Sequence, residues 1–189
     1  MSRLSSDDCR ALLDLARKAI SVAVIEKQIF DLPKCPGALM DSGGAFVTLH
    51  RNGQLRGCVG QVESTTPLAD TVARAAINAA LHDPRFAAVK ADEVTSLEIE
   101  ISVLSPLEPI APEAILVGHH GLLVVNGEKR GLLLPQVASE RRWSSQRFLE
   151  ETCAKAGLPR DAWRDSPTRV LGFTAVVFSD SGVRAHSSS

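Results

Sequence analysis

Apolar side chains recur every three or four residues in three stretches of the chain, which is the spacing of a helix with one buried face. In the first stretch the apolar stripe runs from Cys9 to Val24. In the second, Thr66 is a plausible N-cap and Pro67 suits the first helical position. The expected helices are one capped by Ser5 or Ser6, one that follows Thr66 and stops near His82, and one that starts at Ser144 or Ser145 and is closed by Gly157.

A period of two residues marks a strand over Leu97–Leu104, with apolar side chains on one face. Glu98 and Glu100 share its other face, where they could act as a carboxylate pair but are expected simply to be solvated. The stretch Arg169–Phe178 is apolar on both faces, which predicts a central strand. Residues 180–189 follow neither pattern and are expected to form a frayed tail.

Two Asn-Gly pairs separate further extended segments. This dipeptide favours a two-residue type I′ turn, because both central residues need a positive φ. The expected hairpin arms are Ala45–His50 with Leu55–Val62 around Asn52-Gly53, and Leu122–Val125 with Glu128–Leu133 around Asn126-Gly127. Helices mixed with hairpin-connected strands favour an α+β fold, an antiparallel sheet with flanking helices, over a parallel βαβ sheet.

Composition and charge narrow the class of protein. The 189 residues suit one domain, and 44% hydrophobic with 23% charged residues is ordinary for a globular protein. The 21 basic and 22 acidic side chains give a net charge of -1, so nothing global favours nucleic acid or anionic lipid. The sequence shows no signal peptide and no apolar run of bilayer length, so we expect a cytoplasmic protein that does not bind membranes.

The cysteines and glycines exclude several familiar sites. Cys9, Cys35, Cys58 and Cys153 lie far apart without a C-x-x-C pair, so free thiols are expected rather than disulfides or a zinc site. Neither G-x-G-x-x-G nor G-K-[ST] occurs, so a standard phosphate-binding loop is not expected, and no cofactor is predicted.

The stretch LRGCVG, residues 55–60, is the main candidate for a site. With a two-residue turn before it, Leu49 faces Arg56 and Val47 faces Cys58. Strand alternation then puts Arg56 and Cys58 on one face. A guanidinium beside a thiol favours the thiolate, which is the nucleophilic form of cysteine.

Two interpretations of this stretch stay open. Gly57 and Gly60 beside Cys58 would let a ligand or another main chain come close. Alternatively, Cys58 is a small filler of the core, and Arg56 stabilises a carboxylate or a loop.

The histidines supply weaker candidates. The fold could bring His50 or His82 to Cys58 as a base. His119 and His120, in the stretch GHHG, could offer imidazoles to a metal ion. Adjacent residues of a strand point in opposite directions, and no further ligand motif completes a set, so a solvated turn is favoured and no metal site is predicted.

At LRGCVG the chain resembles the AMMECR domain family, known in microbes as protein A of the AmmeMemoRadiSam system. The hallmark of that family is L-R-G-C-[IV]-G, which is present intact. The resemblance covers nearly the whole chain, and the further matching stretches, in order, are AAINAALHDPRF, LEIEISVLSPLEPI, GLLLPQVASE, Trp143 and FLEETCAKAGLP. The doubled arginine in ERRWSSQ departs from the more neutral or acidic stretch expected there.

The resemblance implies a two-part α+β unit, with a larger subdomain and a smaller one packed beside it. It implies no particular reaction, because the family has no agreed one. Microbial members tend to be encoded beside a Memo-like protein, which is similar to extradiol dioxygenases, and a radical S-adenosylmethionine (SAM) protein. This neighbourhood implies a shared pathway and a complex with one or both of them.

Two functions follow as hypotheses. In the first, the chain is an accessory subunit that docks onto the Memo-like or radical SAM protein, with Arg56 in a bidentate ion pair. In the second, it is a small enzyme that uses Cys58 as a thiolate, with Arg56 holding an anionic substrate. The first is favoured because no complete catalytic set is visible. The expected partner surface is Leu55, Arg56, Gly57, Cys58, Val59 and Gly60.

Overall fold

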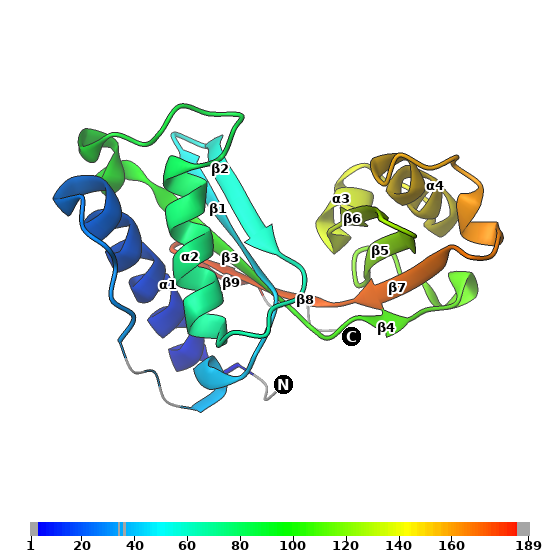
Figure 1. The fold of residues 1–189 in the computed structure, drawn as a ribbon, viewed down its shortest axis with the longest axis horizontal. Helices are drawn as coiled ribbons and strands as arrows, with labels where there is room; N and C mark the ends of the chain where they lie inside the picture. Colours follow the sequence, from blue (N-terminus) through cyan, green and yellow to red (C-terminus); the bar gives the residue numbers. More distant parts are fainter. Residues whose placement is uncertain (1–3, 34, 36, 185–189) are drawn as a thin grey trace. The chain divides into compact units, whose positions relative to one another are not determined.

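The computed structural model describes residues 4–33, 35 and 37–184, and its fold is drawn in Figure 1. The chain divides into two compact units. Unit 1 holds the residues up to Leu104 together with the segment that starts at Val176, and unit 2 holds Ser105–Ala175. Each unit has its own sheet and its own hydrophobic core, and the predicted α+β class is confirmed.

Unit 1 is built on a five-stranded sheet in the order β2-β1-β3-β8-β9. Helices α1 and α2 lie side by side along one face of this sheet (Figure 1) and bury their apolar stripes there. The elements are α1 Ser6–Ser21, the π-helix η1 Val22–Glu26, the 3-10 helix η2 Gly37–Met40, β1 Ala45–Arg51, β2 Gln54–Gln61, α2 Leu68–Leu81, the 3-10 helix η3 Ala91–Ser96, β3 Glu98–Leu104, β8 Ala175–Ser179 and β9 Gly182–Arg184.

Helix α1 begins where the sequence predicts it. The Ser5 hydroxyl accepts a hydrogen bond from the Asp8 main-chain N–H at 3.1 Å, and the Asp8 carboxylate accepts one from the Ser5 N–H at 2.9 Å. This reciprocal capping box satisfies two N–H groups that a helix start leaves free. The apolar stripe between Cys9 and Ile20 is buried, as its spacing predicts.

Helix α2 starts one residue later than expected. Pro67 is its N-cap, whereas Thr66 was the expected one. The Thr66 hydroxyl lies 2.8 Å from that of Ser64 and 3.2 Å from that of Thr71, so it belongs to a small hydroxyl cluster beside the helix start. The helix ends at its C-cap His82, as predicted.

Unit 2 is built on a four-stranded antiparallel sheet in the order β4-β7-β5-β6. Its core packs Leu122 of the sheet against Phe148 and Leu149 of a helix. That helix has Ser144 as its N-cap, as predicted, and Gly157 follows it with a φ of 69°. The elements are β4 Glu108–Pro109, the 3-10 helix η4 Pro112–Ala114, β5 Gly121–Asn126, β6 Lys129–Leu133, α3 Pro135–Glu140, α4 Ser145–Lys155, the 3-10 helix η5 Ala162–Arg164 and β7 Arg169–Phe173.

The second hairpin forms, but its turn lies one residue further along than predicted. Asn126 belongs to β5 and lies opposite Lys129, so the two turn residues are Gly127 and Glu128. Only Gly127 of this turn has a positive φ, 59°. The second arm begins at Lys129, one residue after the predicted start near Glu128.

The end of the chain differs most from its prediction. The expected central strand Arg169–Phe178 is two strands, β7 and β8, which belong to different sheets and are separated by Thr174. An apolar run on both faces cannot show where the chain leaves one sheet for another. Within the expected tail 180–189, residues 182–184 form β9 and pair with β8, while 185–189 lie outside the described residues.

Candidate functional site

The turn of the first hairpin is the predicted one. Asn52 and Gly53 have φ values of 52° and 73°, and Arg51 lies opposite Gln54. Positive φ at both central residues gives the turn the twist of an antiparallel strand pair. The hairpin of β1 and β2 is therefore confirmed.

Beyond the turn the register shifts by one residue, and Arg56 has no partner on β1. The observed pairs are His50 with Leu55, Leu49 with Gly57, Thr48 with Cys58, and Val47 with Val59. The predicted pairs, Leu49 with Arg56 and Val47 with Cys58, are wrong because this β-bulge adds one residue to β2. A bulge also interrupts strand alternation, so it can re-aim a side chain.

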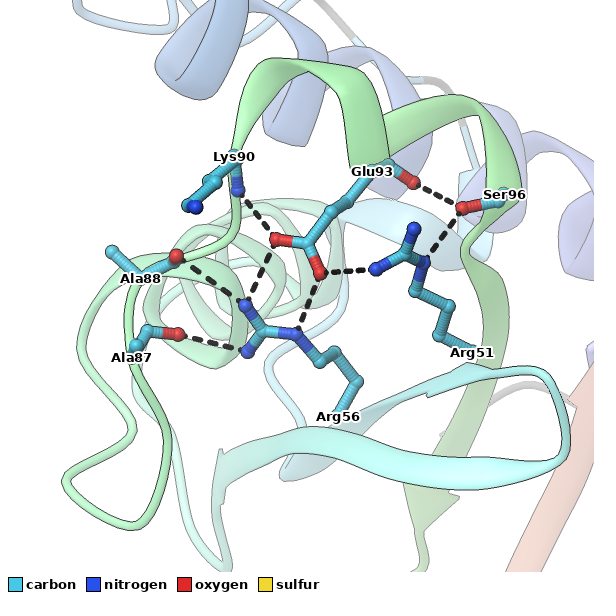
Figure 2. A network of polar contacts seen from close by, with 7 residues as sticks. All are labelled: Arg51, Arg56, Ala87, Ala88, Lys90, Glu93 and Ser96. Carbon is cyan, nitrogen blue, oxygen red and sulfur yellow. Dashed lines mark hydrogen bonds and ion pairs between the residues drawn. The ribbon is translucent and has the colours of Figure 1, made fainter.

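The Arg56 guanidinium binds Glu93 on η3 (Figure 2). Its Nε and Nη2 donate to the two carboxylate oxygens of Glu93, at 3.1 Å each. Its Nη1 donates to the Ala87 carbonyl at 2.8 Å, and Nη2 also donates to the Ala88 carbonyl at 3.3 Å. The guanidinium thus stabilises a carboxylate and a loop, and the expected pairing of Arg56 with the Cys58 thiol is not observed.

Glu93 is the centre of this network. It also accepts from Arg51 Nη1 at 2.9 Å and from the Lys90 main-chain N–H at 2.8 Å, and its side chain is only 10% exposed. The hydrogen bonds from Arg56, followed by that from Lys90, lower the pKa of Glu93 from 4.5 to about 2. The carboxylate therefore stays charged at neutral pH and holds both arginines.

A second carboxylate fixes the main chain of Cys58 itself. Asp83 accepts from the Cys58 N–H at 2.8 Å, and Arg85 Nη2 donates to the Cys58 carbonyl at 3.1 Å. The two side chains are themselves paired at 2.7 Å. The Arg85 hydrogen bonds hold the pKa of Asp83 well below its ordinary value, although burial opposes this. Because β2 is the edge of its sheet, these groups occupy main-chain atoms that a further strand would otherwise use.

The Cys58 thiol is half-buried and lies on the other side of the strand from the helices. Gly57, its neighbour, packs against the main chain of Ala79 on α2, so strand alternation directs Cys58 away from that helix. The Thr48 hydroxyl donates to the Cys58 sulfur at 3.3 Å. Sealed burial in the core, the alternative for this cysteine, is therefore not observed.

We call the surface around this thiol the open face. It is the side of β1, β2 and β3 opposite α2, and among the described residues of unit 1 no helix covers it (Figure 1). Register places Cys58, Thr48 and Glu100 in one row across the three strands. Six side chains of the open face are half-buried or exposed: Phe46, Thr48, His50, Cys58, Glu98 and Glu100. Ser102, which lies on the same face opposite Phe46, is buried.

The two glycines of LRGCVG serve contacts within the chain. A Cβ on Gly57 would overlap with the Ala79 carbonyl, and one on Gly60 would overlap with the main chain of Ala45 and the ring of Phe46. The close approach predicted at these glycines is therefore made by α2 and by β1. The neighbouring Leu55 is 41% exposed.

The candidate histidines do not join the thiol. His82 is exposed, His50 is half-buried, and neither is hydrogen-bonded to Cys58 in the part of the chain that the structure describes. His119 and His120 lie at a turn of unit 2 with ring centroids 4.8 Å apart. Within residues 4–33, 35 and 37–184, no three His, Cys, Asp or Glu side chains gather as a metal site.

Sequence reasoning missed the residues that fix the hairpin. These residues are Asp83, Arg85, Glu93 and Thr48, and no motif of the sequence indicates that they contact β2 or its neighbour. Asp83 and Glu93 lie 25 and 37 residues from their partners on β2, so no local pattern links them. The nearest available signal was the concentration of charge between Asp83 and Glu93, directly after a helix whose sequence predicts burial.

The geometry defines a two-unit α+β protein in which Glu93 and Asp83 hold the β1–β2 hairpin in place. A family model described as AMMECR1 matches residues 13–178. A protein of Methanothermobacter thermautotrophicus is 44% identical over 187 residues, covering 95% of this chain and 97% of that protein. Protein TK0174 of Thermococcus kodakarensis is 41% identical over 192 residues, covering 95% and 94%. The chain belongs to the AMMECR1 family.

A solved structure agrees with the fold. The crystal structure of the uncharacterized protein PH0010 from Pyrococcus horikoshii matches with a TM-score of 0.84 at 42% sequence identity, covering 91% of each chain. No described helix of the present chain is long and apolar enough to cross a membrane.

Proposed function

We propose that this protein is a non-catalytic accessory subunit that binds a protein partner through the open face, with Cys58 at its edge on β2. The observation that carries the proposal is the contrast between the two sides of β2. Arg56 and the main chain of Cys58 are bound within the chain, whereas the thiol side is left half-exposed. The bracing from Asp83 and Glu93 gives this surface a preformed shape, which lowers the entropic cost of binding.

The polar groups of the open face indicate the chemistry of the partner. Glu98 and Glu100 have no ion pair among the described residues, and Phe46 lies on the same face of the sheet, two positions along β1 from the partner of Glu100. A surface with two free carboxylates and an aromatic ring suits a partner with a basic patch beside an apolar one. The resemblance to the AmmeMemoRadiSam system makes the Memo-like protein and the radical SAM protein the first partners to test, in the cytoplasm.

The test is binding between the purified full-length chain and each of these proteins, alone and together. Glu100→Lys reverses a charge on the open face and should weaken binding at least about tenfold. Glu113→Lys, on η4 of unit 2, makes the same charge change elsewhere and should leave binding unchanged. Equal effects of the two variants, or no complex with any of the proteins, would refute the proposal.

Arg56→Ala is the wrong variant for this purpose. Its guanidinium makes four hydrogen bonds to Glu93, Ala87 and Ala88, so the substitution would disturb the segment 87–93 as well as any interface. A loss of binding in that variant would not identify a contact residue.

A small Cys58-dependent enzyme is the second candidate. The observation that favours it is the half-exposed sulfur of Cys58, which a substrate could reach and which accepts a hydrogen bond from the Thr48 hydroxyl at 3.3 Å. An anionic substrate would need a cation other than Arg56. The test is the alkylation rate of Cys58 against pH: a midpoint near that of a free thiol, about 8.5, counts against a catalytic thiolate.

A further inference from the structure

Unit 2 contains a cavity that the proposed function does not use. It has a volume of about 210 Å³ and lies where the starts of β4 and β5 meet the end of β7. This is below the range of about 300–1,000 Å³ typical of pockets for drug-sized ligands, so a smaller, metabolite-sized molecule suits it. The lining is Ser105, Pro106, Glu108, Pro109, Ile110, His120, Gly172, Phe173 and Thr174.

The walls combine apolar surface with a few polar groups, as small-molecule sites do. Ile110 and two prolines supply the accessible apolar part, and Phe173 also lines the cavity but is only 2% exposed. Gly172 leaves its main chain bare, and a Cβ there would come within 3.0–3.1 Å of the Ile110 side chain. The glycine therefore lets the Ile110 side chain pack closely on the main chain of β7.

The polar groups leave one strong acceptor without a partner. The carboxylate of Glu108 is exposed and makes no hydrogen bond or ion pair with any described residue. The hydroxyl of Thr174 is likewise unpaired among the described residues, whereas the Ser105 hydroxyl already accepts from the Thr174 N–H at 2.9 Å. Neither lysine nor arginine lines the cavity, so nothing offsets the charge of Glu108.

His120 contributes a neutral donor. Its Nδ1 accepts from the Leu116 main-chain N–H at 3.0 Å, so the ring proton of the neutral imidazole is on Nε2. Burial, followed by the neighbouring His119, lowers the pKa of His120, which favours this neutral form. The imidazole therefore adds no positive charge to oppose a cation.

We propose that this cavity binds a small organic cation: an amine whose ammonium group pairs with Glu108 and whose apolar body packs against Ile110 and the two prolines. An ammonium group makes charge-assisted hydrogen bonds to a carboxylate. An anion of the same size would meet the Glu108 carboxylate without a compensating cation. This ligand class is independent of the docking surface in unit 1.

The experiment is a titration of the isotope-labelled full-length chain with phenethylamine, followed by nuclear magnetic resonance. Its matched probes are 2-phenylethanol, which is neutral, and phenylacetate, which is anionic. We expect phenethylamine to shift the signals of His120, Gly172 and Phe173, with a dissociation constant on the order of 1 mM or tighter. The neutral and anionic probes should bind at least about tenfold more weakly.

Two variants separate the charge from the shape of the site. Glu108→Gln should weaken phenethylamine binding about tenfold, whereas Glu113→Gln, which does not line the cavity, should not change it. Gly172→Ala should also weaken binding, because the added methyl group would displace the Ile110 side chain that lines the cavity, and thermal unfolding checks that the variant is folded.

Three results would overturn the proposal: equal affinity for the neutral probe, unchanged affinity in Glu108→Gln, or shifts that map outside the cavity. Absence of binding at 10-fold above the expected constant would overturn it as well.

Discussion

The two Asn-Gly hairpins, one in each unit, have the same residues at the same spacing but differ in the position of the turn and in the pairing of their strands. Residues 52–57 read NGQLRG and residues 126–131 read NGEKRG, so an Arg-Gly pair follows each Asn-Gly at the same distance. In both, the second glycine lies against a helix main chain. Gly57 packs on Ala79 of α2, and Gly131 packs on Thr152 and Ala156 of α4.

The arginines take opposite roles. In the first hairpin the turn is Asn52-Gly53 and a bulge follows, so Arg56 leaves the ladder and binds Glu93. In the second the turn moves to Gly127 and Glu128, the ladder stays regular, and Arg130 is exposed without a partner among the described residues. The same sequence pattern thus gives an arginine that is hydrogen-bonded within the chain in the first hairpin and a solvent-exposed arginine in the second.

The difference teaches that a distant acceptor decides what such an arginine does. Glu93 and the carbonyls of Ala87 and Ala88 accept hydrogen bonds from the Arg56 guanidinium. These bonds replace the water that the guanidinium loses when it becomes half-buried. Arg130 lies opposite Val125 and has no such acceptor among the described residues.

Both hairpins have a glycine that packs against a helix main chain, and adding a methyl group to that glycine should have the largest effect on stability. Gly57→Ala and Gly131→Ala each force a strand away from a helix main chain, and we expect each to lower the free energy of unfolding by about 3 kcal/mol or more. Both tryptophans, Trp143 and Trp163, lie in unit 2, so tryptophan fluorescence can measure the unfolding of the Gly131→Ala variant. Hydrogen exchange measures the stability of unit 1 in the Gly57→Ala variant.

Gly53→Asn is the control for these variants, because nothing lies near that position and asparagine tolerates its positive φ. A cost of the alanine substitutions no larger than that of this control would contradict the packing argument.

Replacing each arginine by alanine should affect the two hairpins differently. Arg56→Ala leaves the carboxylate of Glu93, which is 10% exposed, with fewer partners, so we expect a loss of about 2–4 kcal/mol in urea unfolding. Arg130→Ala should change stability by less than about 0.5 kcal/mol. Arg56→Lys should rescue little, since lysine lacks the bidentate geometry. Similar costs for the two alanine variants would remove the distinction between the hairpins.

Acid should weaken the first hairpin selectively. The pKa of Glu93 is about 2 in the folded chain against an ordinary 4.5, so protons bind the unfolded chain more readily. The stability from this group is complete above about pH 5 and is lost as the pH falls toward 2. Hydrogen exchange of the β2 amides should therefore accelerate in this range before that of the β6 amides. Glu93→Gln should flatten the dependence, and an unaltered profile in that variant would assign it to other groups.

The smallest effect on stability is expected at the thiols. Cys58 is half-buried, whereas Cys153 on α4 is buried and its pKa is raised by that burial. Iodoacetamide at neutral pH should modify Cys58 at least about tenfold faster than Cys153, as measured by mass spectrometry. Cys58→Ser should cost less than about 1 kcal/mol. A Cys58 as protected as Cys153 would show that the open face is covered.

Much of the fold follows from local pattern. The caps Ser5 and Ser144, the turn Asn52-Gly53 and the alternating strand ending at Leu104 are all where the sequence predicts them. Each depends on residues within a few positions of one another, so the physics that sets them is visible in the sequence. The division of Arg169–Phe178 between two sheets depends on which strands lie beside it, and no local pattern carries that information.

Only some features of the candidate site can be predicted from the sequence in this way. The sequence by itself determined that an arginine, a thiol and two glycines stand together behind a tight turn, and that Cys58 is a free thiol. Tertiary structure decided the register, because one extra residue in β2 exchanges the facing pairs. It also decided that Arg56 serves Glu93 rather than the thiol, since a charge goes to the partner that compensates its desolvation best, and that partner lies 37 residues away.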